Sequence, residues 1–151
     1  MKIGVISDTH GLLREEVLES LKDCEVIIHG GDINKPQILE ILEKLAPLYV
    51  VRGNNDKGEW AELLEEEKVF TLAGKKILLI HNKKEISKDL EEMDLVIYGH
   101  SHKYHCEKVG RTWWLNPGSC GKRRFGLPIT WAILKIEDND IRIEQFSIPM
   151  A

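Results

Sequence analysis

Side chains that can bind a metal ion are grouped in five short clusters along the chain. They are two aspartates, one asparagine and four histidines, namely Asp8, His10, Asp32, Asn54, His81, His100 and His102. Oxygen and nitrogen donors without a thiolate suit divalent first-row metals. A carboxylate has two oxygens and can bridge two cations, so Asp32 is the natural shared ligand. The residue types therefore predict a divalent metal centre.

Nearly every cluster follows a run of apolar residues that predicts a strand. The runs are Ile3–Ile6, Val26–Ile28, Leu48–Val51, Ile77–Ile80 and Leu95–Tyr98. Because one kind of element repeatedly delivers polar residues from its end, we expect them to share one site at one edge of a sheet.

Each cluster taken alone has an ordinary structural explanation. Asp8 could form an Asx turn or cap a helix, and the glycine-asparagine string at residues 53–55 could be a plain turn. A lone histidine such as His81 is more often a hydrogen-bonded structural residue. His29 and His105 are expected to be structural rather than ligands, and only the complete set favours metal binding.

The first half of the chain alternates strands and helices, which predicts a largely parallel sheet covered by helices. Helices are expected at residues 14–22 and 36–45, with Asn34 as a cap of the second, and at 59–67 and 85–92. A hairpin turns at residues 73–75, and the last part is mainly β, at 104–109, 112–115, 129–136 and 141–146. Two sheets packed together with helices outside would accommodate both halves.

The whole chain of 151 residues is expected to form one domain, residues 1–151. Its net charge of -4 argues against a general nucleic-acid-binding surface. The three cysteines include no CxxC pair, which indicates a reducing compartment. With no signal peptide and no apolar run that could cross a bilayer, we expect a cytoplasmic protein that does not enter the membrane. Apolar or aromatic residues on the last strands could support a homo-oligomer.

Taken in order, these strings resemble those of the calcineurin-like metallophosphoesterase superfamily. The strings are DTH at residues 8–10, GGD at 30–32, GNND at 53–56, a lone His81 and GHSH at 99–102. NPGS at residues 116–119 is similar to a string of the small bacterial and archaeal phosphodiesterase branch of that superfamily. The resemblance spans residues 1 to about 125, and five ordered motifs are far more specific than any one of them.

The resemblance implies a four-layer α/β/β/α sandwich of two mixed sheets flanked by helices, with two divalent metal ions at its edge. One ion would be held by Asp8, His10, Asp32 and His102, and the other by Asp32, Asn54, His81 and His100. Mn²⁺ is the leading expectation, with Zn²⁺, Fe²⁺, Co²⁺ or Ni²⁺ as alternatives. A hydroxide bridging the two ions would attack phosphorus in line.

One residue departs from the pattern of larger family members, which carry a histidine where this chain has Asn55. A carboxamide is not a practical proton donor near neutral pH, so phosphodiesters with good leaving groups are favoured as substrates. Asn55 could instead orient a phosphate oxygen, and Arg123, in the basic string 122–124, could contact non-reacting phosphate oxygens. Asn55, His100 and Arg123 are the residues expected to act in catalysis, although a solvated basic loop explains Arg123 nearly as well.

Three functions remain open from the sequence. The first is a phosphodiesterase acting on a small phosphoester. The second is a protein-interaction scaffold with a vestigial or weakly active metal site, since a retromer subunit of this superfamily keeps the fold but serves chiefly as a binding platform. The third is a phosphomonoesterase or nucleotide phosphatase.

Overall fold

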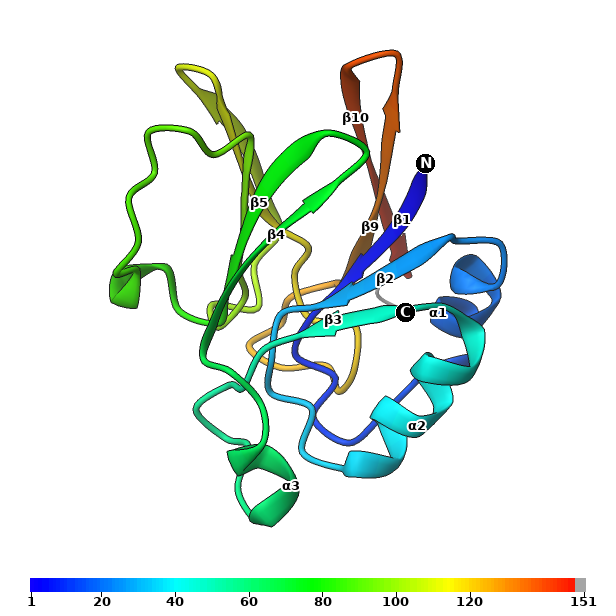
Figure 1. The fold of residues 1–151 in the computed structure, drawn as a ribbon. Coiled ribbons are helices and arrows are strands. Elements are labelled where there is room, and N and C mark those ends of the chain that lie inside the picture. The colour runs from blue at the N-terminus through cyan, green and yellow to red at the C-terminus, as the bar shows by residue number, and fades with distance from the viewer. Residues whose placement is uncertain (149–151) are drawn as a thin grey trace.

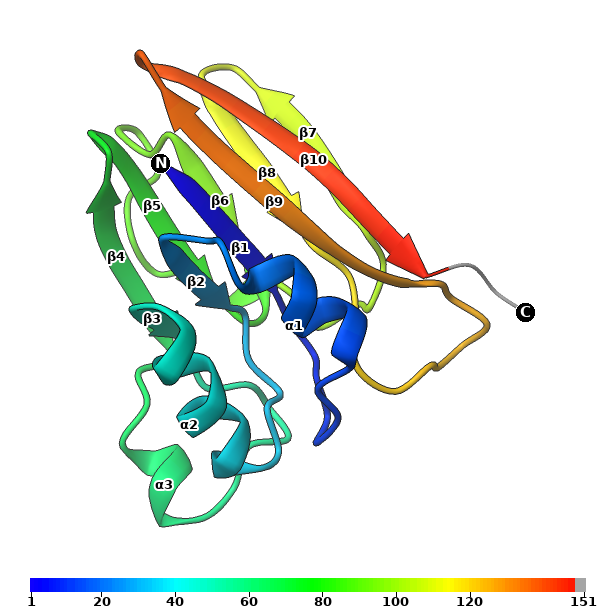
Figure 2. The same ribbon diagram turned by 90° about the vertical axis from the view of Figure 1, so that its right-hand side faces the viewer.

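Two five-stranded sheets pack face to face in the computed structural model, which describes residues 1–148 (Figures 1 and 2). The first sheet has the order β10-β9-β1-β2-β3, and the second has the order β4-β5-β6-β8-β7. Both contain parallel and antiparallel pairs, which confirms the expectation of two mixed sheets. Along the described chain, no helix has the length and apolarity needed to cross a bilayer.

The first sheet is built from the two ends of the chain. Its strands are β1 (Lys2–Ile6), β2 (Val26–His29), β3 (Leu48–Val50), β9 (Ile129–Glu137) and β10 (Asp140–Ile148). The three N-terminal strands run parallel, and β9 pairs antiparallel with β1. Helices α1 (Glu15–Leu21) and α2 (Pro36–Leu45) cover the outer face of this sheet (Figure 2).

The second sheet comes from the middle of the chain. Its strands are β4 (Glu67–Leu72), β5 (Lys75–Ile80), β6 (Leu95–Ile97), β7 (His105–Val109) and β8 (Thr112–Asn116). The predicted β4–β5 hairpin is confirmed, and its turn residues Ala73 and Gly74 both have positive φ, as a tight two-residue hairpin turn requires.

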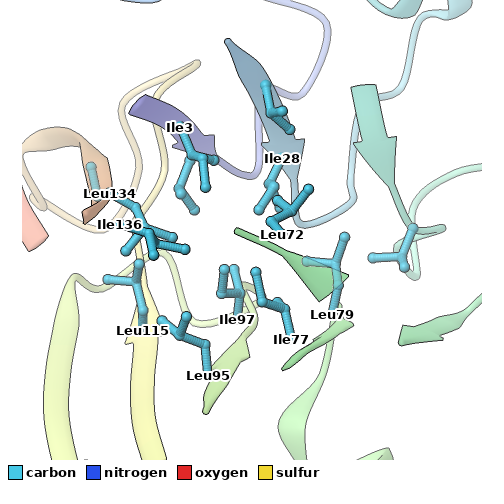
Figure 3. Close-up of a cluster of buried hydrophobic side chains, with 14 residues drawn as sticks. Ile3, Ile28, Leu72, Ile77, Leu79, Leu95, Ile97, Leu115, Leu134 and Ile136 are labelled. Carbon is cyan, nitrogen blue, oxygen red and sulfur yellow. The ribbon is translucent and has the colours of Figure 1, made fainter. Parts of the chain in front are cut away.

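The main hydrophobic core lies between the two sheets (Figure 3). Ile3, Ile28 and Leu134 of the first sheet face Ile77, Ile97 and Leu115 of the second, and all are fully buried. Burial of apolar side chains stabilises each by roughly 1.5–3 kcal/mol relative to exposure. This packing fixes the two sheets relative to each other and therefore fixes the loops that leave their strands.

The mainly β second half does not form a sheet of its own. The chain crosses from β8 in the second sheet to β9 in the first, and β6 and β8 pair in parallel. The physical reason lies in β9, whose residues Ile129–Leu134 are buried on both faces. A strand that is apolar on both faces is stable inside a sheet covered on both sides, beside β1.

The helix expected at residues 85–92 is wrong. A single 3₁₀ turn, η1 (Lys83–Glu85), is followed by irregular chain up to Met93. Side chains satisfy the backbone donors there: the Glu67 carboxylate accepts from the Ser87 and Lys88 N–H groups, and Asp89 accepts from Glu91. The fourth layer of the sandwich is therefore irregular, and it packs Ile86 and Leu90 against the second sheet.

The helix expected at residues 59–67 is shorter than predicted. Helix α3 covers only Glu59–Glu62. The Arg52 N–H donates to the Glu65 carbonyl at 2.8 Å, so by residue 65 the chain has left the helix and lies beside the loop after β3. Glu67 then begins strand β4.

Candidate metal centre

Five loops that leave strand ends converge on one edge of the sandwich. Asp8 and His10 follow β1, Asp32 follows β2, Asn54 follows β3, His81 follows β5, and His100 and His102 follow β6. The parallel strands β1 and β2 end side by side, and the loops after them lie at the same end of the molecule (Figure 2). Parallel strands of the two sheets thus deliver the predicted ligands to one place.

The backbone of these loops is unusual. Five of the predicted ligands have φ in the left-handed region: Asp8 (55°), His10 (47°), Asp32 (60°), His100 (75°) and His102 (63°). Such a conformation is uncommon for non-glycine residues, costs about 1–3 kcal/mol each, and is concentrated at functional sites. The fold therefore holds costly backbone conformations where the polar side chains meet.

Two glycines let the loops approach the carboxylates. A Cβ on Gly99 would lie 2.6 Å from Asp8 Oδ2 and would also overlap Ser7 Oγ, and a Cβ on Gly53 would overlap the Asp32 carboxylate. Side chains at these positions would displace the two aspartates. The glycines that open the GHSH and GNND strings are thus required by close packing.

Asp8, His10 and His102 form the first group of side chains, and all three are buried. Asp8 Oδ1 lies 3.5 Å from His10 Nε2 and 3.4 Å from His102 Nε2, and the two ring nitrogens are 3.2 Å apart. Three Lewis-basic atoms at these separations can serve as ligands of one cation placed between them.

Asp32 and His81 form a second buried group together with the same Asp8. Asp32 Oδ2 lies 3.2 Å from His81 Nε2 and 3.7 Å from His10 Nε2. One carboxylate oxygen of Asp32 thus lies between histidines of the two groups, as a shared ligand would. Asp8 Oδ1 also reaches both groups, at 3.9 Å from His81 Nε2.

Asn54 and His100 lie on the exposed side of this cluster. Asn54 Oδ1 is 3.1 Å from His100 Nδ1, and the His100 ring packs edge-on against His81 with centroids 5.2 Å apart. The structure therefore brings all seven predicted ligands into one neighbourhood, with five of them buried and these two at its rim.

The buried atoms of the cluster are short of protein partners. Among residues 1–148, Asp8 Oδ1, His81 Nε2 and His102 Nδ1 have no hydrogen-bond partner. A buried polar atom left unpaired costs about 1–3 kcal/mol. Two of these atoms face the cluster, and a divalent cation would satisfy them, so the residues present fit a metal centre.

The charges of the cluster are coupled. Burial disfavours the charged form of His81, yet Asp32 and Asp8 outweigh it and raise its pKa. Burial acts against the Asp32 carboxylate as well, and His81 with the Asn55 N–H lowers its pKa. For His102, burial lowers the pKa, and His10 and Arg124 add to the effect. Carboxylates and imidazoles thus share a small volume, in which Asp32 and Asp8 favour positive charge on His81 while burial disfavours it on His102.

The hydrogen bonds behind the ligands fix their ring orientations. His81 Nδ1 lies 2.8 Å from the Gly30 carbonyl oxygen and donates to it, which leaves Nε2 to the cluster. Asn34 was expected to cap a helix, but α2 has Lys35 as its N-cap residue without a side-chain cap bond. The Asn34 carboxamide instead lies 3.3 Å from His10 Nδ1, a contact that the cap interpretation missed.

His29 is structural, as expected. Its ring is fully buried, its Nδ1 accepts from the Gly31 N–H, and its Nε2 lies 3.0 Å from Thr9 Oγ1. Burial lowers the pKa of His29 to about 4, so the ring is neutral at physiological pH. His105 lies on β7, exposed, and pairs with Glu107.

Asp56 is a site residue that the sequence interpretation missed. Its buried carboxylate accepts four backbone N–H bonds, from Asp32 (3.0 Å), Ile33 (2.8 Å), Asn34 (2.8 Å) and Gly53 (2.9 Å). It therefore ties the Asp32 loop to the loop that carries Asn54. Asp56 stands as the last letter of the GNND string, and that position was its only signal.

The NPGS string holds two ligand loops in place. Asn116 Nδ2 donates to the Gly99 carbonyl and to Ser101 Oγ, and Ser119 Oγ donates to the Asp8 carbonyl at 2.9 Å. These bonds support the loops that carry His100 and Asp8. The string is thus a structural support beside the metal-binding residues.

Asn55 lies against the shared carboxylate. Its backbone N–H donates to Asp32 Oδ1 at 2.8 Å, and its side-chain Nδ2 donates to Asp32 Oδ2 at 3.3 Å. Arg123 is exposed on the loop after Gly121, and its catalytic role stays a prediction. On the same loop, the 79% exposed Phe125 packs edge-on against His102, with ring centroids 5.6 Å apart, which the sequence interpretation did not foresee.

Comparison with known proteins gives a consistent result. The profile of the Calcineurin-like phosphoesterase superfamily domain matches residues 1–139. A probable metallophosphoesterase of Methanothermobacter thermautotrophicus is 34% identical over 79% of this chain and 77% of its own. A phosphodiesterase of Methanocaldococcus jannaschii is 30% identical over 94% of this chain and 97% of its own.

Solved structures share the fold. The phosphoesterase YfcE of E. coli superposes with a TM-score of 0.74 at 25% identity, covering 99% of this chain and 100% of its own. Vps29 of Entamoeba histolytica superposes with a TM-score of 0.75 at 23% identity, covering 99% and 100%. The sequence profile, the relatives and the convergence of the predicted ligands agree, and the chain belongs to the calcineurin-like phosphoesterase superfamily.

Proposed function

We propose that this protein is a dimetal-dependent phosphodiesterase. The observation that carries the proposal is the buried cluster in which Asp32 Oδ2 lies between His10 and His81, with unpaired ligand atoms around it. The similarity to a named phosphodiesterase over nearly the full chain supports the same conclusion.

The residues divide between two positions. Asp8, His10 and His102 would hold one ion, Asn54, His81 and His100 the other, and Asp32 would be shared. Bound divalent ions lower the pKa of coordinated water and neutralise charge on phosphoryl oxygens. Mn²⁺ is the ion we propose, because oxygen and imidazole donors suit it, with Zn²⁺, Fe²⁺, Co²⁺ and Ni²⁺ as alternatives.

The side chains around the ions have separate tasks. Asn55 positions the shared carboxylate through its two bonds to Asp32. Arg123 is proposed to bind non-reacting phosphate oxygens, since a guanidinium donates two parallel hydrogen bonds. No imidazole occupies position 55 to protonate a leaving group, so esters whose leaving groups depart without protonation should react fastest.

The test is hydrolysis of bis(p-nitrophenyl) phosphate with each metal in turn. Activity should require added metal, disappear with chelator and disappear in Asp32→Ala. Metal bound per chain, measured by elemental analysis, should be about two in the wild type. Wild-type protein that binds two ions but hydrolyses no phosphoester would refute the enzymatic proposal.

The same experiments separate the alternatives. Faster hydrolysis of p-nitrophenyl phosphate than of the diester would favour a phosphomonoesterase. A stoichiometric protein partner, retained by Asp32→Ala in the absence of any hydrolysis, would favour a scaffold. We also propose, from the sequence, that the protein is cytoplasmic and can form a homo-oligomer.

A further inference from the structure

A groove extends from the metal centre across the outer face of the second sheet. Its near part, about 350 Å³, is lined by His100 of the metal centre together with Lys83, Lys84, Tyr98, Lys103 and His105. Its far part, about 450 Å³, shares Lys83, Lys84, Tyr98 and His105 and continues to Trp114. The two parts adjoin each other because these four residues line both, and together we call them the lysine groove.

The lysine groove is positively charged in a protein whose net charge is -4. No aspartate or glutamate lines its near part. Within residues 1–148, no ion pair involves Lys83, Lys84 or Lys103. Glu107 lines only the far part, where it pairs with His105. The ammonium groups nearest the metal centre are therefore available to an anion.

The other side of His100 has the opposite character. The hollow there is lined by Glu66, Glu85 and Arg52, beside Asn54 and His81 of the metal centre. Two flanks of one site thus differ in the sign of their charge. An extended anion bound at the metal centre would be directed along the lysine groove and away from Glu66.

Two of the three lysines, Lys83 and Lys84, are carried on the ordered turn η1. Asn82 caps η1 by accepting a hydrogen bond from the Lys84 N–H at 3.1 Å. The Lys83 ammonium lies over the buried Tyr98 ring, 5.1 Å from its centroid. At the far end the half-buried Trp114 packs edge-on against Tyr98 and offers a flat surface. Cations that follow a backbone together with an aromatic surface for bases are what single-stranded nucleic acid binds.

We propose that the lysine groove binds the phosphates and bases adjoining the scissile diester, so that the substrate is a short single-stranded oligonucleotide. This inference rests on the proposed phosphodiesterase function. It adds that recognition reaches beyond the reacting phosphate, through Lys84 and Lys103, to at least one base at Trp114.

The first test measures binding without catalysis. Fluorescence anisotropy follows a labelled hexathymidylate titrated with protein, in chelator, over a series of salt concentrations. The double variant Lys84→Gln/Lys103→Gln should weaken binding and flatten the plot of log affinity against log salt by about 0.7 for each phosphate that the variant no longer neutralises. Lys44→Gln is the matched control, because Lys44 is exposed on α2 over the other sheet.

The second test measures hydrolysis with metal added. For each lysine replaced by glutamine, kcat/KM on the oligonucleotide should fall by up to about fivefold. The rate on bis(p-nitrophenyl) phosphate, which has a single phosphate, should not change. Equal reductions on both substrates, or no reduction on either, would overturn the groove assignment while leaving the phosphodiesterase proposal intact.

Two further outcomes are decisive. Trp114→Leu, once its unfolding curve shows that it is folded, should weaken oligonucleotide binding; unchanged binding would overturn the assignment to a base-bearing strand. Wild-type protein that binds the oligonucleotide with the expected salt dependence but hydrolyses no diester would support the groove and refute the proposed function.

Discussion

Replacement of Asp56 by asparagine tests whether one carboxylate holds the metal-binding loops together. The wild-type side chain accepts two N–H bonds on each oxygen: Oδ2 from Asp32 and Gly53, and Oδ1 from Ile33 and Asn34. An asparagine has one carbonyl oxygen, and its NH₂ group would face two backbone donors. Asp56→Asn therefore keeps at most two of the four bonds.

The size of the effect follows from these bonds. Hydrogen bonds to a charged group contribute about 1.5–3 kcal/mol each, and a buried donor left without an acceptor carries a further penalty. Loss of two bonds, partly relieved by relaxation of the loops, should lower the free energy of unfolding by about 4 kcal/mol. Domains of this kind have about 5–15 kcal/mol in all, so the variant should remain folded but be much less stable.

The assay is urea unfolding in chelator, which separates the effect on the fold from any effect of bound metal. The matched control is Asp89→Asn, which removes the same charge from an exposed side chain that makes one backbone bond, to Glu91. It should change the free energy of unfolding by less than about 0.5 kcal/mol. If Asp56→Asn were no more destabilising than Asp89→Asn, the proposed role of Asp56 would be refuted.

Three further predictions concern Gly99, the Glu67 carboxylate and the effect of bound metal on stability. Gly99→Ala should weaken Mn²⁺ binding at least about tenfold, because its Cβ would displace Asp8, and calorimetric titration against wild type measures this. Burial raises the pKa of the Glu67 carboxyl, but hydrogen bonds from Ser87 and Lys88 outweigh burial and lower the pKa. Solvent screens this partly exposed carboxylate, so Glu67→Gln should lower the free energy of unfolding by only about 1 kcal/mol at neutral pH. The difference in stability between wild type and Glu67→Gln should vanish at acidic pH, where the wild-type carboxylate is protonated. Urea unfolding at several pH values measures this difference, and a larger difference at acidic pH would contradict the prediction. Metal at about 100 times its Kd should raise the free energy of unfolding by about 2.7 kcal/mol, and an unchanged melting temperature on chelation would count against the centre.

The strands that position the site could be predicted because buried strands appear in the sequence as short runs of apolar residues. Ile3–Ile6, Val26–Ile28 and Ile77–Ile80 are short apolar runs, and each lies within or at the end of an observed strand. The polar residues after them could be assigned to one edge because parallel strands end together. The sequence pattern and the topology agree for these strands, whereas the place of β9 beside β1 depends on long-range packing.

Two of the errors occurred where distant side chains replaced local backbone hydrogen bonds. The pattern at residues 85–92 has helical spacing, yet Glu67, from a different part of the chain, binds the Ser87 and Lys88 N–H groups. Asn34 precedes a helix and has a typical capping side chain, yet it contacts His10. Neither partner is near in sequence, so local propensity could not identify either contact.

The conformation of the ligand loops has an energetic cost that the rest of the fold must offset. Left-handed backbone at Asp8, Asp32 and His102 is unfavourable for residues with a Cβ, and glycine would adopt it at less cost. Glycine at these positions would stabilise the backbone, yet the chain keeps polar side chains there. Several such positions in one buried cluster indicate a requirement other than folding. The hydrogen bonds of Asp56 and of the NPGS string offset part of that cost. Asp8 Oδ1 and His81 Nε2 are buried without a hydrogen-bond partner, and a bound cation would remove this further penalty. Stability and metal affinity are therefore coupled in this protein, and replacement of a left-handed ligand residue by glycine should strengthen the fold while weakening the metal centre.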